Sequence, residues 1–270
     1  MKYFLLGAVI GDVVGSTKEW KTDISPEFKF ITKANRFTDD TILTLAVSEA
    51  LLKNRPFDMM IQKYARKYPR MGYGGMFTKW ANTAGDRAAY NSYGNGSAMR
   101  GLSIPLFYND LPTVLRQAVK QSSCTHNHTD SLDAVMQLAH VTFMARTCKD
   151  KSELYKMLKS TYGYEYKKPG DVDTRKNSLH SITGVHEAFN CFFTGNDFTE
   201  VLRESIMHGG DTDTLAAIAC GLAYVFYEKL PNELAERVLR IIPEEFRKII
   251  KEFAKITEGK KLVEKSVTLF

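Results

Sequence analysis

The sequence predicts an all-α protein, and two observations carry that prediction. Apolar side chains recur with the 3.6-residue period of an amphipathic helix along nearly the whole chain of 270 residues, whereas the alternation typical of a β-strand is scarce. Glycine and asparagine gather instead in short segments that we expect to be loops: residues 72–75, 91–96, 170–177 and 209–210.

Several of the expected helices have recognisable start signals. Pro56, Pro112, Pro231 and Pro243 each lie at or near the first turn of a periodic segment, where helices tolerate proline, and Asp197 precedes another segment as an N-cap. The first helix has small residues at four-residue intervals, which indicates close packing against a neighbour. In chain order we expect helices at 3–16, 40–53, 56–67, 97–109, 112–123, 129–147, 151–160, 180–193, 198–207, 213–228, 232–241 and 244–256.

The chain is expected to form one domain over residues 1–270. Its apolar fraction of 44% and charged fraction of 25% are those of an ordinary globular protein. Residues 161–178 form the longest stretch without helical period and could be a domain boundary. We interpret them as an irregular loop, because acidic motifs on either side of them need a shared core.

Composition and charge exclude several function classes. The 37 basic and 31 acidic residues give a net charge of +6, spread along the chain without the compact basic patch of a nucleic-acid-binding protein. No segment reaches the roughly 18 apolar residues of a membrane span. The four cysteines lack CxxC spacing, so we expect free thiols in a reducing cytoplasm. The N-terminal apolar segment favours a core helix over a signal peptide. We expect a cytoplasmic monomer.

Two acidic motifs stand directly before long apolar helical patterns. Residues 37–41 read Phe-Thr-Asp-Asp-Thr, and residues 209–214 read Gly-Gly-Asp-Thr-Asp-Thr. At a helix end the chain is turning, so adjacent carboxylates can each reach one ion of a metal pair, and threonine hydroxyls add neutral oxygens. Such an all-oxygen set suits Mg²⁺, Mn²⁺ or Ca²⁺ and does not suit Zn²⁺. The candidate ligands are Thr38, Asp39, Asp40, Asp211, Asp213 and Thr214.

Helix capping is the structural alternative. Asp and Thr are good N-caps and complement the helix macrodipole, so capping explains either motif alone about as well as metal binding does. A cap needs only one such residue, however. Two motifs of this density favour the metal site, because like charges crowded together are unfavourable without a cation.

Other candidates are weaker when taken singly. The segment 92–100 (Ser-Tyr-Gly-Asn-Gly-Ser-Ala-Met-Arg) has glycines that let a backbone approach a ligand, and the helix start that follows it can hold phosphate oxygens. It could equally be an ordinary turn. His126 and His128 are a poor zinc pair, and we favour polar ligand contacts for His126. A lone Glu19 is more often solvated than catalytic.

Taken together and in this order, the motifs resemble the ADP-ribosylglycohydrolase family, typified by the bacterial dinitrogenase reductase-activating glycohydrolase. The resemblance spans nearly the whole chain, through Gly11-Asp12 with Gly15 and Glu19, then 37–41, 72–74, 94–100, Thr125-His126 and 209–214. It implies a compact, roughly orthogonal multi-helix bundle with a binuclear Mg²⁺ (or Mn²⁺) centre in a cleft. His208 and the loosely matched stretch 125–128 depart from the family pattern, which bears on substrate preference.

The resemblance also implies roles for individual residues. The six oxygen ligands named above would hold two Mg²⁺ or Mn²⁺ ions, and Glu19 matches an acidic residue beside them. Glu19, Asp40 or Asp213 could accept the proton of the attacking water. The matched loop that receives the ADP-ribose diphosphate comprises Gly94, Asn95, Gly96, Ser97 and Met99. The residues expected to line the same cleft are Gly72, Tyr73, Gly74 and His126.

The function that these expectations describe is metal-dependent hydrolysis of ADP-ribose from modified side chains of an ADP-ribosylated protein, with arginine as the foremost acceptor. The bond cleaved lies at the anomeric carbon of the ribose. Two alternatives remain at this point. One is a catalytically silent ADP-ribose-binding or structural protein on the same fold, and the other is a metal-dependent phosphohydrolase.

Overall fold

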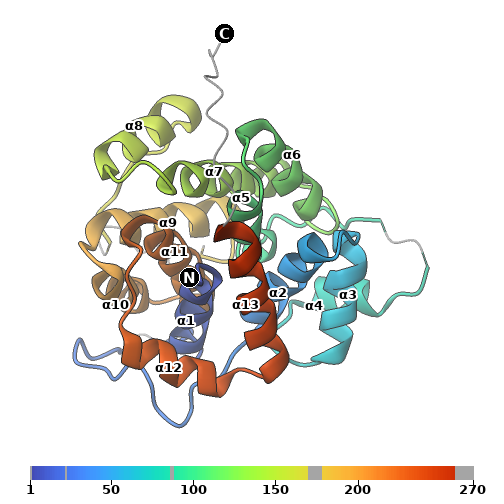
Figure 1. Cartoon of the computed structure of the whole chain (residues 1–270), viewed down its shortest axis with the longest axis horizontal. Helices are drawn as coiled ribbons and strands as arrows, with labels where there is room; N and C mark the ends of the chain where they lie inside the picture. Colours follow the sequence, from blue (N-terminus) through green and yellow to red (C-terminus); the bar gives the residue numbers. More distant parts are fainter. Residues whose placement is uncertain (1, 22, 86–87, 170–177, 259–270) are drawn as a thin grey trace.

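The chain folds into helices and loops, and the expectation of an all-α fold is confirmed (Figure 1). The computed structural model describes residues 2–21, 23–85, 88–169 and 178–258, and within them the only β-pairing is one bridge between Gly94 and His180. The elements are α1 (Leu5–Gly15), α2 (Asp39–Leu52), α3 (Phe57–Lys67), α4 (Gly75–Asn82), a 3-10 turn η1 (Asn95–Ser97), α5 (Ser103–Phe107), α6 (Leu111–Ser122), α7 (Thr129–Ala145), α8 (Lys151–Tyr162), α9 (Ser181–Thr194), α10 (Phe198–His208), α11 (Thr212–Tyr227), α12 (Asn232–Ile241) and α13 (Glu244–Glu258).

Two segments differ from the sequence prediction. The helix expected over 97–109 is broken into η1, a turn and the short α5, because Gly101 is a poor helix former and Arg100 turns inward to hydrogen-bond Gln121. The helix α4 was not expected. The glycines at its start are typical of a loop, so no helix signal is visible in the sequence there. A helix of eight residues is stabilised by tertiary packing more than by helix propensity, and here Phe77 and Trp80 are buried. The loop predicted at 170–177 lies outside the described residues.

Helices α1 and α11 form the centre of the fold, with other helices arranged around them (Figure 1). All of α1 is buried, as is α11 from Thr212 to Phe226. A helix that is apolar on every side belongs inside a protein, because it has no face suited to water. Within the described part of the chain, no helix is both long and apolar enough to cross a membrane. All four cysteines are free thiols.

Glycines let the backbones of α1 and α11 touch. A Cβ atom added to Gly11 would lie 2.1 Å from the Ala216 carbonyl oxygen, and one added to Gly15 would lie 2.5 Å from the Cα atom of Asp213. Gly7 has a similar contact with α11 one turn earlier. The small-residue spacing therefore does produce close helix packing. This packing also places the last turn of α1 beside the first turn of α11, where the second acidic motif begins.

We expect Gly11→Ala to destabilise the protein by about 1–3 kcal/mol, the usual cost of overpacking, even though alanine is the better helix former. Gly75→Ala is the matched control, because a Cβ atom there meets nothing within 4 Å. Urea unfolding of both variants gives the comparison. Equal free energies of unfolding for the two variants would show that the α1–α11 contact is not tight.

Candidate functional site

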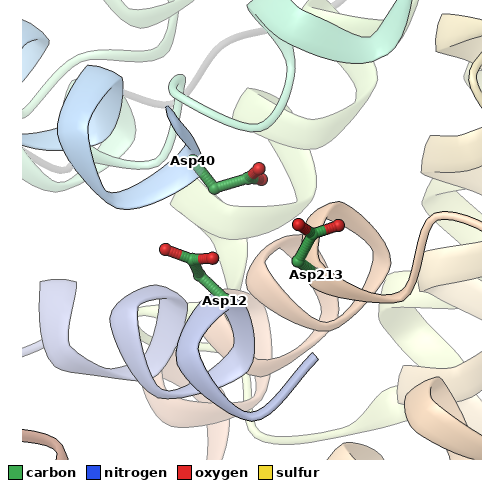
Figure 2. A group of neighbouring side chains, drawn as sticks. All are labelled: Asp12, Asp40 and Asp213. Carbon is green, nitrogen blue, oxygen red and sulfur yellow. The ribbon is translucent and has the colours of Figure 1, made fainter. Parts of the chain in front are cut away.

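The two acidic motifs meet at the floor of one cleft. Carboxylate oxygens of Asp12, Asp40 and Asp213 lie within 4.8 Å of one another, and so do oxygens of Glu19, Asp211 and Asp213. Figure 2 shows the first group, with one side chain from each of α1, α2 and α11 directed toward a common region. Asp213 belongs to both groups. The cluster is therefore two overlapping oxygen sets that share one carboxylate.

The cleft above this floor has a volume of about 970 Å³. Most of the residues that the sequence singled out line it, so the structure gathers segments from both halves of the chain around one space. Those lining residues are Glu19, Thr38, Asp39, Asp40, Gly72, Gly74, Gly94, Asn95, Gly96, Met99, His126, Asp211, Asp213 and Thr214.

Asp12 is a site residue to which the sequence reasoning gave no role, although it belongs to one of the motifs that carry the family resemblance. Its side chain is fully buried and accepts hydrogen bonds from the amide of Thr38 at 2.9 Å, the hydroxyl of Thr38 at 2.7 Å and the amide of Thr41 at 3.1 Å. The Thr41 hydroxyl donates to it as well. Asp12 thus caps α2 from α1. The signal was a single carboxylate in an otherwise apolar helix, since charged residues are rarely fully buried without partners.

The hydroxyl of Thr38 links α1 to the start of α2. It donates its proton to Asp12 and accepts the Asp40 amide at 3.3 Å, so Thr38 is also the N-cap of α2. Capping accounts for less of the second motif, because the side chain of Asp211, the N-cap of α11, makes no capping hydrogen bond. The capping alternative therefore explains Thr38 and does not explain the side chain of Asp211.

Asp40 has one oxygen without a partner. The Thr214 hydroxyl donates to Oδ2 of Asp40 at 3.2 Å, whereas Oδ1 is buried and receives no hydrogen bond from a described residue. A buried carboxylate oxygen left without a donor is costly. Together with the threonine and carboxylate oxygens around it, this atom fits a hard divalent cation.

Burial and the crowding of like charges together raise the pKa values of the cluster. Burial, and then the charge of Asp213, raises the pKa values of Asp39, Asp40 and Asp211 well above the ordinary range of an aspartate. The same two causes raise the pKa of Asp12 to about 7. They also raise the pKa of Glu19, a half-buried residue at the edge of the cluster. Adjacent negative charges repel one another. In the absence of cations, bound protons would therefore be needed to neutralise some of these carboxylates.

The loop after α3 packs against Asp39. The Asp39 amide donates to the Met71 carbonyl at 2.9 Å, and a Cβ atom on Gly72 would lie 2.6 Å from Oδ1 of Asp39. Gly72 also has a φ of +107°, so both space and backbone conformation require glycine there. Asp39 lines the cleft but lies outside both close carboxylate groups.

Two residues expected to contact substrate do not line the cleft. Tyr73 turns inward and stacks its ring on Phe77, with centroids 5.2 Å apart. Ser97 is fully buried, and its hydroxyl accepts a hydrogen bond from Ser122 at 2.8 Å. A motif identifies the segment that approaches a ligand but not the direction of each side chain, which here follows from packing against α4 and α6.

The glycine-rich segment connects the acidic floor to the far wall of the cleft. Asn95 donates one amide hydrogen bond to Oδ2 of Asp211 at 2.5 Å and another to the Ser178 carbonyl at 3.2 Å. Asn95 therefore positions a carboxylate of the cluster. Opposite it, burial and then the charge of Arg100 lower the pKa of His126 to about 3, so this imidazole is neutral.

The rim contains residues that the sequence reasoning did not select. His180 lines the cleft, its Nε2 lies 3.0 Å from Oδ2 of Asp130, and its ring lies 5.4 Å from that of the exposed Tyr93. No motif surrounds His180 in the sequence. It reaches the rim through a β-bridge to Gly94, which is far from it along the chain. His208, which drew attention beside the second acidic motif, does not line the cleft.

Comparison with known proteins identifies relatives along nearly the whole chain. The family described as ADP-ribosylglycohydrolase matches residues 2–265. ADP-ribosylhydrolase ARH3 of Mus musculus is 28% identical over 84% of each chain. ADP-ribosyl-[dinitrogen reductase] glycohydrolase of Rhodospirillum rubrum is 25% identical over 82% of this chain and 83% of its own. A solved ADP-ribosylglycohydrolase-related protein complex shares the fold with a TM-score of 0.74, at 22% identity over 94% of this chain and 96% of its own.

Without divalent cations, the free energy of unfolding should fall as the pH rises from about 4 to above 7. The buried carboxyls have raised pKa values in the folded state, including about 7 for Asp12, whereas an unfolded aspartate titrates near pH ~4. The folded state then binds more protons in this interval, so stability is lost as they dissociate. Urea unfolding in EDTA from pH 4 to 8 measures this slope, and excess Mg²⁺ should flatten it. A slope of opposite sign in EDTA would contradict the prediction.

Proposed function

The chain belongs to the ADP-ribosylglycohydrolase family, as its motifs indicated, and on that premise we propose that it is a metal-dependent hydrolase that removes ADP-ribose from modified side chains. The observation that carries the proposal is the shared carboxylate: two oxygen groups overlap at Asp213 on the floor of the cleft. Two overlapping groups suit a pair of divalent cations better than a single ion.

We propose two Mg²⁺ ions, with Mn²⁺ as a substitute, held by oxygen atoms of both helix starts. The unpartnered Oδ1 of Asp40 and the crowding around Asp213 support this assignment. Asp12 is not among the proposed ligands, because its carboxylate already accepts four hydrogen bonds. It supports the site by holding Thr38 in position. The proposed ligands are Thr38, Asp39, Asp40, Asp211, Asp213 and Thr214.

When bound, such cations supply positive charge near the ribose and lower the pKa of a water molecule. The chain's own carboxylates then have two tasks in cleaving the bond at the anomeric carbon. They stabilise the oxocarbenium character that develops in the sugar, and one of them accepts the proton of the attacking water. The candidates for that proton are Glu19, Asp40 and Asp213.

Glu19 is well placed to move a proton. It is half-buried at the edge of the cluster, and the indole N–H of Trp20 donates to its Oε1 at 2.8 Å. Burial raises the pKa of Glu19 toward neutral pH, and a general acid or base is most effective when its pKa lies near the working pH. We propose arginine as the acceptor side chain, because Glu19 is outside the proposed ligand set and leaves a carboxylate at the edge of the cluster that attracts a cationic guanidinium group.

Release of intact ADP-ribose tests the function. Incubated with Mg²⁺ and an arginine-ADP-ribosylated protein, the chain should liberate free ADP-ribose, and EDTA should stop the reaction. Serine-linked and nucleic-acid-linked conjugates serve as parallel substrates, and chromatography identifies the product. Release of AMP or phosphate would instead indicate a phosphohydrolase. Metal-dependent binding without turnover on any conjugate would indicate a silent ADP-ribose-binding protein.

Asp211→Asn should reduce kcat/KM by at least about a hundredfold, a loss typical of removing one charge-stabilising group from an active site. The fold should survive, because relief of carboxylate crowding offsets the lost charge. The free energy of unfolding in EDTA should therefore stay constant or rise.

The matched control is Asp197→Asn. Asp197 caps α10 and accepts the Glu200 amide at 2.8 Å on the surface, and asparagine is an equally good cap. Activity and stability should both be retained there. A large loss of stability in Asp211→Asn alone would assign Asp211 a structural role.

A further inference from the structure

Trp20 is an exposed aromatic residue at the edge of the cleft. It is 47% exposed, whereas tryptophan is highly buried on average. Its indole N–H donates to Oε1 of Glu19 at 2.8 Å, and Glu19 lines the cleft, so the indole stands on the rim beside the acidic floor. The neighbouring cation, Lys18, lies over the ring of Phe28 at 5.6 Å. The exposed part of the Trp20 ring is therefore open to a ligand.

The backbone holds Trp20 in a conformation that is unfavourable for any residue with a Cβ atom. Its φ is +60°, in the left-handed region. The Trp20 amide donates to the carbonyl of Gly210 at 2.8 Å, directly before Asp211 of the second acidic motif. One hydrogen bond thus fixes the backbone of Trp20 and the other fixes its side chain. The ring is held beside the Glu19 carboxylate and is not a loosely attached surface group.

An acceptor side chain has to cross this rim. The acceptor is attached to the anomeric carbon and belongs to a protein, which is too large to enter a cleft of about 970 Å³. It therefore reaches the acidic floor from outside, past the group that exchanges a proton with it. Glu19 attracts a cationic acceptor, but Arg36 also lines the cleft and its charge acts on Glu19, which offsets part of that attraction. A preference for arginine then needs a second contact.

We propose that Trp20 is a specificity-determining residue, whose indole face receives the guanidinium group of the arginine acceptor beside the carboxylate of Glu19. The inference rests on the proposed function, which supplies the acceptor. A guanidinium is planar and weakly hydrated, and it stacks on aromatic faces, of which tryptophan offers the best. A neutral serine linkage lacks the charge that this contact needs. The ring does not have to rearrange, because the backbone and the two hydrogen bonds already hold it in place.

A matched pair of variants separates the ring face from the indole N–H. Trp20→Phe keeps an aromatic face and Trp20→Leu keeps only an apolar side chain, whereas both lose the donor to Glu19 and both retain a Cβ atom at this φ. With Mg²⁺ and an arginine-ADP-ribosylated protein, kcat/KM should be about three- to fivefold lower in Trp20→Leu than in Trp20→Phe, the value of an exposed cation–π contact. Calorimetry should give the two variants equal affinity for free ADP-ribose, which has no acceptor. Thermal unfolding should confirm that both fold.

Equal kcat/KM in Trp20→Phe and Trp20→Leu overturns the proposal. So does a difference of the same size in their affinity for free ADP-ribose, because the ring would then act on the nucleotide or the fold and not on the acceptor. A wild-type protein that releases no ADP-ribose from the arginine-linked conjugate overturns the proposed reaction instead. The conjugate is then a stable ligand, and the ratio of its dissociation constants in the two variants decides the role of Trp20. A conjugate that wild type does not bind overturns both.

Discussion

Mutual repulsion among buried carboxylates around Asp213 is the constraint on which the site depends. Burial, and then the charge of Asp213, raises the pKa of each carboxyl near it, from Asp12 on α1 to Asp211 two residues away. Such an arrangement is stable only if protons or cations neutralise it. Protons would leave the carboxylates unable to accept a proton from water, so a hydrolase built on this cluster requires cations. The chemistry and the electrostatics therefore point to the same need.

The scaffold must hold these groups together against their repulsion. It does so through a close backbone contact, where glycines of α1 bring Asp12 beside the first turn of α11. Asp12 in turn fixes the start of α2 by accepting hydrogen bonds from Thr38 and Thr41. Three helices are thereby joined at one point, and the hydroxyl of Thr38 is oriented by the same bonds. Packing and site geometry therefore have a common origin.

The parts of this site that the sequence predicts are those that depend on local structure. Asp39, Asp40, Asp211 and Asp213 could be grouped because a helix start is visible in the sequence around each motif. Asp12 was missed because its partners lie 26 and 29 positions away, at Thr38 and Thr41. His180 reaches the rim through a bridge to a segment far earlier in the chain. The directions of the Tyr73 and Ser97 side chains could not be predicted either, because they depend on packing against neighbouring helices.

The cleft is lined by the carboxylate cluster and also by the buried cation Arg100, and both bear on how a ligand would lie in it. In the proposed enzyme the floor would hold cations beside the ribose, whereas Arg100 has a buried Nη1 without a hydrogen-bond partner among the described residues. Asn95 lies between the two regions and hydrogen-bonds Asp211 from the glycine-rich segment. Under the proposed function, the ribose lies at the acidic floor and the diphosphate along the glycine-rich segment, so Asn95 stands at the junction of the two subsites.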